Sequence, residues 1–126
     1  MKYKLKECLF YNTEGSNTLP LMDVYETTDF LVFEIDLPGV DLNDVSINVY
    51  DDIVVIEGIK SAEVRPQDCR YLCMERSFDS FRRMIKIPVK VNNSEGKAKY
   101  VDGVIRLTLP KVKDRVINIK IEKELD

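Results

Sequence analysis

The chain contains no histidine among its 126 residues. It therefore lacks the usual general base, the commonest metal ligand and the one side chain that ordinarily titrates near neutral pH. A Ser-His or Cys-His nucleophile pair is excluded for the same reason. Glycine is also scarce, and neither Gly39 nor Gly103 lies in a phosphate-cradling pattern such as the P-loop. Nucleotide binding has no support from the sequence.

Cysteine is nearly as rare, with Cys8, Cys69 and Cys73 the three present. An odd number of scattered cysteines argues against a disulfide framework and indicates a reducing, cytoplasmic setting. Three residues separate Cys69 from Cys73, whereas redox and zinc motifs have a gap of two. We expect two incidental thiols, with a thiol or metal enzyme as the weaker alternative. The sequence thus predicts no enzyme activity, no metal and no cofactor.

Long hydrophobic runs are missing as well. No segment approaches the roughly 20 apolar residues that a membrane-spanning helix needs. The N-terminus is basic but has no hydrophobic stretch typical of a secretory signal. The 19 basic and 22 acidic residues give a net charge of −3, which offers no basic surface for nucleic acid. We expect a cytoplasmic protein that has no membrane span and binds no nucleic acid.

What the sequence does have is a repeated alternation of apolar and polar residues over 44% apolar content. Such alternation is typical of half-buried strands, and no window of eleven or more residues shows the period of a helix. The spacing predicts an all-β, sandwich-like domain of about eight or nine short strands. The alternating segments are 31–37, 45–49, 81–87, 103–111 and 116–122, whereas 53–56 is apolar on both faces and is predicted to be central.

The polarity pattern divides the chain into three parts. We expect a short N-terminal arm over 1–19, the β domain over 20–111 and a C-terminal extension over 112–126. Residues 60–72 break the strand rhythm and are long for a hairpin loop, and long loops in compact domains usually have a function or are mobile. The extension ends in a stripe of isoleucines that must be buried on its own domain or on another copy.

Arg83 lies on the same strand face as Phe81, Ile85 and Ile87. An unpaired charge in such a position is costly to bury. We therefore expect Arg83 to pair at a subunit interface. The alternative is an edge-strand arginine whose head reaches water along its apolar stem.

In four stretches the chain resembles the small heat shock proteins, the α-crystallin domain family. Residues 23–40 resemble the opening strands and Leu-Pro-Gly turn of the family, and 56–58 resemble the end of a central strand. Residues 75–88 resemble its Glu-Arg-Ser-aromatic segment, and 98–111 its Ala-x-x-x-x-Gly-Val-Leu signature. The resemblance covers about 20–121 and is to bacterial-type members that carry a swap loop.

This resemblance implies an immunoglobulin-like β-sandwich and an ATP-independent holdase of the stress response, which keeps partly unfolded proteins from aggregating. It also implies a homodimer in which a strand in the protruding loop of one subunit pairs with the first strand of the other, and assembly into larger homo-oligomers. The alternative is a co-chaperone-like interaction module that binds one folded partner as a monomer and needs no swap loop.

The resemblance further assigns residues to contacts. For the dimer interface these are Leu21, Met22, Val24, Tyr25, Arg70, Tyr71, Leu72 and Arg83. For the Ile-x-Ile anchor they are Ile117, Ile119 and Ile121, and for the groove that receives an anchor they are Val45, Ile47, Val49, Ala98 and Tyr100. For client binding by the arm they are Leu5, Leu9, Phe10 and Tyr11.

Overall fold

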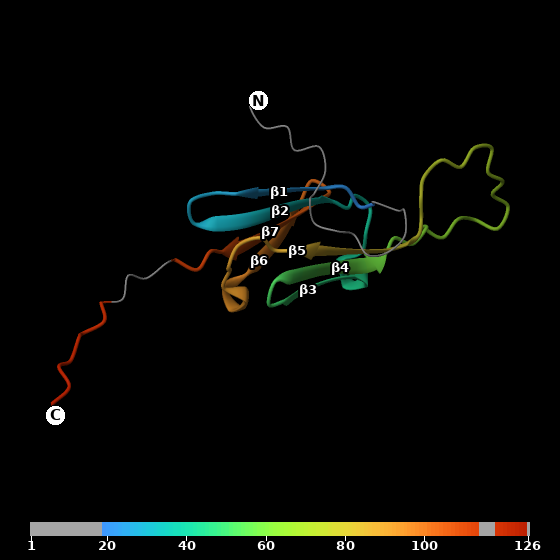
Figure 1. Cartoon of the computed structure of the whole chain (residues 1–126). Helices are drawn as coiled ribbons and strands as arrows, with labels where there is room; N and C mark the ends of the chain where they lie inside the picture. The colour runs from blue at the N-terminus through green and yellow to red at the C-terminus, as the bar shows by residue number, and fades with distance from the viewer. Residues whose placement is uncertain (1–18, 114–117, 126) are drawn as a thin grey trace.

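A computed structural model describes residues 19–113 and 118–125. Within these residues, two antiparallel sheets pack face to face as a sandwich (Figure 1). The four-stranded sheet has the order β1 (Met22–Glu26), β2 (Phe30–Asp36), β7 (Val104–Pro110), β6 (Lys97–Val101). The three-stranded sheet has the order β3 (Val45–Tyr50), β4 (Ile53–Ile59), β5 (Ser80–Lys86). Two single helical turns, η1 (Leu42–Asp44) and η2 (Asn93–Glu95), lie between strands.

The expected alternation is confirmed in the core. The inner faces of both sheets supply its fully buried side chains, among them Phe33, Ile35, Val54, Ile56 and Ile85. The prediction that 53–56 forms a central strand is also correct, because β4 lies between β3 and β5 and three consecutive residues of it are buried. The apolar pattern thus fixes one core between two layers.

Tight turns join the strands of two hairpins, β3–β4 and β6–β7. Asp102 (φ 53°) and Gly103 (φ 78°) both adopt the left-handed conformation between β6 and β7, as a type I′ turn requires. Asp51 (φ 38°) turns the chain between β3 and β4. The two turns set the register of two edge strands, β3 and β6.

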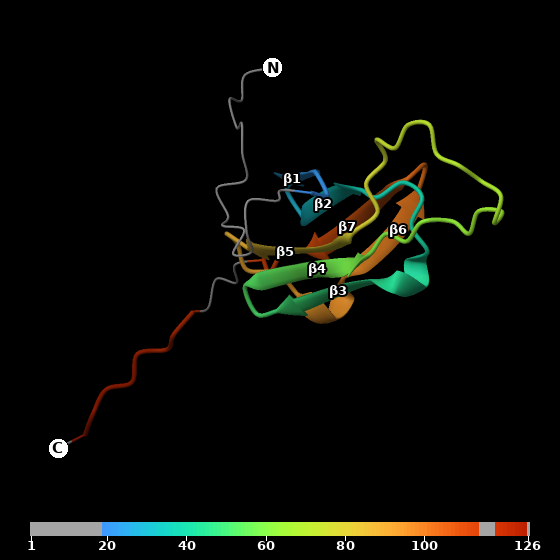
Figure 2. The same cartoon turned by 90° about the vertical axis from the view of Figure 1, so that its right-hand side faces the viewer.

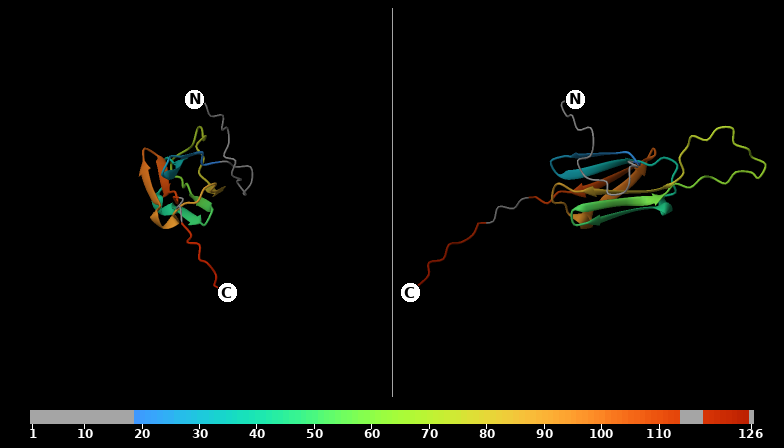
Figure 3. Two further views of the ribbon diagram at one scale, coloured as in Figure 1. Left: turned by 60° about the vertical axis from the view of Figure 1, so that its left-hand side comes forward. Right: turned by 45° about the vertical axis from the view of Figure 1, so that its right-hand side comes forward.

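Seven strands form in the described residues, fewer than the eight or nine expected. The shortfall has two sources. The chain between β4 and β5 contains no strand, and neither does the described tail, 118–125. Figure 3 shows the β4–β5 loop projecting from one end of the sandwich and the C-terminal extension leaving from the other. Neither of these two expected strands forms within the described residues.

Candidate functional site

The outer edge of β1 is open to strand addition. The Leu21 carbonyl accepts from the Asp36 amide at 3.0 Å, and the Thr27 amide donates to the Phe30 carbonyl at 2.8 Å. In an antiparallel ladder every second residue bonds to the neighbour, so the intervening backbone groups of β1 point away from β2. Those outward groups belong to Met22, Val24 and Glu26, and no described strand covers them.

The side chains at this edge are divided between core and solvent. Met22 and Val24 are half-buried and pack against the core, whereas Leu21 and Tyr25 are exposed. The four residues predicted to receive a swapped strand thus lie together on one open edge. An exposed edge with apolar side chains is a template for another strand.

The predicted donor residues lie in the loop between β4 and β5, which extends well clear of both sheets (Figure 2). Leu72 is 87% exposed, and Arg70 and Tyr71 are exposed as well. Arg65 donates to Glu63 at 3.1 Å, and Tyr71, with a smaller contribution from Glu63, raises the pKa of the Arg65 guanidinium above its ordinary value. Contacts in this loop are mainly local, so its apolar side chains remain available to a partner.

Arg83 is buried on the core-facing side of β5, with 7% of its surface exposed. One terminal nitrogen, Nη1, donates to the Pro20 carbonyl at 3.0 Å, and Nε has no hydrogen-bond partner. No carboxylate of the described residues forms a salt bridge with it. Arg83 is therefore buried, and its pairing at a subunit interface stays a prediction. Its single described partner is a backbone carbonyl, which the sequence pattern could not indicate.

A cavity of about 250 Å³ opens beside Pro20, at the base of the β4–β5 loop. The chain entering β1, the end of β2 and the chain entering β5 form its walls. Its lining residues are Leu19, Pro20, Leu21, Asp36, Leu37, Pro38, Lys60, Ser77, Asp79, Ser80 and Phe81. Pro20 and Leu21 join this cavity to the Arg83 contact and to the open edge of β1.

The five predicted groove residues lie on the edge strands β3 and β6, one from each sheet. Val45, Ile47 and Val49 are half-buried and pack on the core from β3. On β6, Tyr100 is half-buried and donates its hydroxyl hydrogen to the Leu37 carbonyl at 2.8 Å, whereas Ala98 is exposed. The structure therefore places all five on two strand edges that carry partly covered apolar surface.

The described part of the anchor is fully open to solvent. Ile119 and Ile121 are 80% and 93% exposed, and every described residue of the tail is exposed. Ile117 lies outside the described residues, as do Cys8 and the four predicted client-binding residues, Leu5, Leu9, Phe10 and Tyr11. Ile119 and Ile121 thus have no apolar cover from their own domain in this structure.

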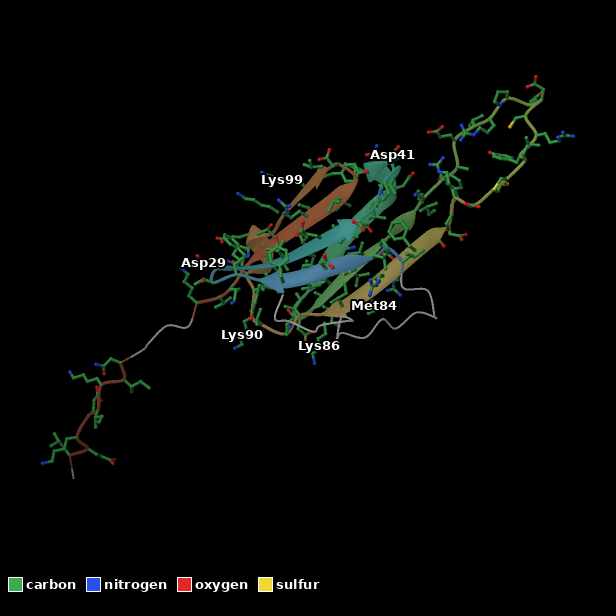
Figure 4. The ribbon with its side chains drawn as sticks, turned by 90° about the horizontal axis from the view of Figure 1, so that it is seen from above. Asp29, Asp41, Met84, Lys86, Lys90 and Lys99 are labelled. Carbon is green, nitrogen blue, oxygen red and sulfur yellow. The ribbon has the colours of Figure 1, made fainter. Side chains whose placement is uncertain are left out.

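Sequence reasoning missed the contacts that hold the base of the extension. Lys111 forms a salt bridge with Glu26 at 3.1 Å, and Lys113 forms one with Asp29 at 3.2 Å. The Lys111 amide also donates to the Asp29 carbonyl at 2.8 Å. Figure 4 shows Asp29 and Lys90 at the end of the domain from which the extension leaves. These partners are distant in sequence, and only the strand pairing of β2 with β7 brings them together.

The described residues contain no group of three or more His, Cys, Asp or Glu side chains that could hold a metal ion. They also contain no helix long and apolar enough to cross a membrane. What the fold defines is an immunoglobulin-like β-sandwich whose edge strands are β1 and β6 in one sheet and β3 and β5 in the other.

Residues 23–123 match the Hsp20/alpha crystallin family, and the chain belongs to this family. Small heat shock protein C2 of Rickettsia felis is 32% identical over 114 residues, covering 88% of this chain and 74% of that protein. Spore protein SP21 of Stigmatella aurantiaca is 37% identical over 103 residues, covering 81% of this chain and 61% of that protein. This chain therefore spans less than two thirds of the length of the Stigmatella protein.

Two solved structures carry the same fold. Heat shock protein 16.0 of Schizosaccharomyces pombe superposes with a TM-score of 0.72 at 30% identity. A small heat-shock protein of Xylella fastidiosa, described as having a distinct high order structure, superposes with a TM-score of 0.72 at 25% identity. Each comparison covers 83% of this chain and 97% of the other. The all-β sandwich expected from the sequence is confirmed, and membership of the family is consistent with a chaperone role.

Proposed function

We propose that the protein is an ATP-independent holdase of the cytoplasm, which binds partly unfolded proteins and keeps them from aggregating without converting them. Its working unit is a dimer in which the β4–β5 loop of each subunit adds a strand to β1 of the other. The observation that carries this proposal is that one chain has both an open β1 edge and a long loop that exposes Tyr71 and Leu72. A monomeric interaction module would not require such a loop.

The apolar surfaces support the client-binding half of the proposal. Half-buried Val45, Ile47 and Val49 line one open edge, and Leu72 and Met74 are exposed on the loop. Exposed apolar patches of this kind mark interaction surfaces. Partly unfolded proteins offer unpaired backbone and apolar side chains, which are the groups that strand edges recognise.

The test is to measure mass in solution by light scattering together with suppression of the thermal aggregation of a model client protein. We expect the full chain to be dimeric or larger and to reduce client aggregation without ATP. A chain lacking 62–70 should become monomeric. A full chain that is monomeric and gives no protection would overturn the proposal in favour of the single-partner module. Unchanged dimers after the deletion would refute the strand swap alone.

A further inference from the structure

The two thiols of the β4–β5 loop, Cys69 and Cys73, flank the residues proposed to form the swapped strand. Both side chains are exposed and unpaired with each other. Three residues separate them, and these are the predicted donor residues Arg70, Tyr71 and Leu72. Any covalent link between the two sulfur atoms would therefore enclose the donor segment.

Strand geometry makes such a link incompatible with the swap. Residues four apart in an extended strand have Cα atoms roughly 13 Å apart, at about 3.3 Å per residue. A disulfide needs Cα atoms about 4.4–6.8 Å apart. The segment from Cys69 to Cys73 can thus be an extended strand or a closed disulfide ring, and it cannot be both.

In the single chain the segment from Cys69 to Cys73 is not held as an extended strand. The Cys69 amide donates to the Pro66 carbonyl at 3.0 Å, closing a turn just before the segment. A bend follows at Leu72, one residue before Cys73. The chain therefore changes direction at both ends of the segment, and ring closure does not require an ordered strand to be broken first.

Charged side chains lie near both thiols. Arg65 lies within electrostatic range of Cys69. Arg65 and Arg76 also line, together with Cys73, a cavity of about 70 Å³ inside the loop. The Cys73 thiol contacts one carboxylate, with Sγ 3.7 Å from Oε1 of Glu75. Both thiols are exposed, so a small-molecule disulfide can reach them.

We propose that Cys69 and Cys73 form a reversible disulfide within the loop, and that this disulfide prevents the loop from donating its strand to a partner. This inference rests on the proposed strand swap. The oxidant is a small-molecule disulfide. One cysteine thiolate attacks it and displaces a thiol, and the second cysteine then attacks the mixed disulfide and displaces the other. The two cysteines lose two electrons and two protons, and the oxidant becomes two thiols.

The experiment uses the full chain with Cys8→Ser, so that the two loop cysteines are the ones available to react. The protein is treated with oxidised glutathione or with dithiothreitol, and its disulfides are mapped on peptides while its mass is measured by light scattering. We expect one Cys69–Cys73 bond in the oxidised sample and a fall from dimer to monomer. The dimer should return on reduction. Variants that add Cys69→Ser or Cys73→Ser should remain dimeric under both conditions.

The outcomes separate the inference from the proposed function. A reduced chain that is already monomeric refutes the strand swap, and the coupling fails with it. A reduced dimer whose cysteines do not pair with each other, or pair between subunits, refutes the disulfide but leaves the swap standing. If the Cys69–Cys73 bond is mapped and the protein is still dimeric, the disulfide forms but does not prevent the strand swap.

Discussion

Gly58, in β4, lies where the neighbouring η1, β3 and β5 leave no room for a side chain. A Cβ at this position would overlap the Asp44 carbonyl oxygen and approach Cζ of Phe81 to 2.9 Å and Cα of Val45 to 3.1 Å. Two of these three neighbours are backbone atoms, which cannot turn aside as a side-chain end can. The bare backbone at this position therefore allows η1 and β3 to lie close against β4.

Gly58→Ala should lower the free energy of unfolding by about 1–3 kcal/mol, the usual cost of overpacking. Gly96→Ala is the matched control, because its Cβ would meet the Cδ2 end of the Leu109 side chain, which can move. Urea denaturation of both variants measures the difference. If both variants lost the same free energy of unfolding, the backbone around Gly58 would relax more readily than its geometry indicates.

Arg83 poses a different question, since its charge is buried with a single carbonyl partner. Replacing a buried ion by an apolar side chain of similar volume is often neutral for folding. If a partner subunit supplies the missing carboxylate, Arg83→Met should keep the fold but weaken the dimer. We expect the dimer dissociation constant to rise at least about tenfold, or about 1.4 kcal/mol.

Dilution series followed by light scattering measure that constant, and circular dichroism checks the fold. A second variant, Arg83→Ala, loses the donor to the Pro20 carbonyl as Arg83→Met does, but also leaves a cavity, so it should destabilise the domain more than Arg83→Met. A dimer of undiminished affinity in Arg83→Met would place the role of Arg83 entirely within its own chain.

At the scale of elements, the strand β1 can be tested without unfolding the sheet. The amide of Val24 points to the open edge, whereas that of Tyr25 faces β2, by the alternation of the ladder. Proline is tolerated in edge strands where the lost N–H faces outward. Val24→Pro should therefore leave the ladder to β2 intact and block an added strand.

We expect Val24→Pro to be mainly monomeric, with an unfolding free energy similar to that of Val24→Ala, which removes the same half-buried side chain. Tyr25→Pro should instead destabilise the fold, because it removes a hydrogen bond within the sheet. Light scattering and urea denaturation distinguish the three variants. Dimers in Val24→Pro as tight as those in Val24→Ala would mean that β1 is not the receiving strand.

Some of these elements could be predicted from the sequence and others could not. Strands and hairpin turns were predictable, because alternation at 31–37 and turn residues such as Asp102 and Gly103 are local signals of burial and backbone conformation. The strand expected near Tyr71 does not form in the single chain, since its hydrogen-bond partners are proposed to be on another. The salt bridge of Lys111 with Glu26 was missed because the partners are neighbours only through the pairing of β2 with β7.

At the scale of the whole molecule, the exposed isoleucines of the tail should decide assembly beyond the dimer. Fully burying each isoleucine contributes about 1.5–3 kcal/mol, before the cost of ordering the tail. The double variant Ile119→Ala with Ile121→Ala should therefore reduce larger oligomers to dimers. A chain ending at Lys113 should behave in the same way.

The matched control is Asn118→Ala with Lys120→Ala, which changes the opposite face of the same segment and should leave the oligomers intact. Light scattering at several concentrations gives the subunit number for each. Oligomers that survive the loss of both isoleucines would exclude the tail as the link between dimers.

The loop and the extension leave from opposite ends of the sandwich (Figure 3). A strand exchange is reciprocal and closes on two subunits, whereas a tail that reaches a different surface on its neighbour is a head-to-tail contact, which either closes into a ring or shell or continues indefinitely. Subunit number would then depend on the angle and reach of the extension rather than on its affinity. Lengthening the segment between Lys113 and Ile119 should change how many dimers close an assembly while leaving each dimer as it is.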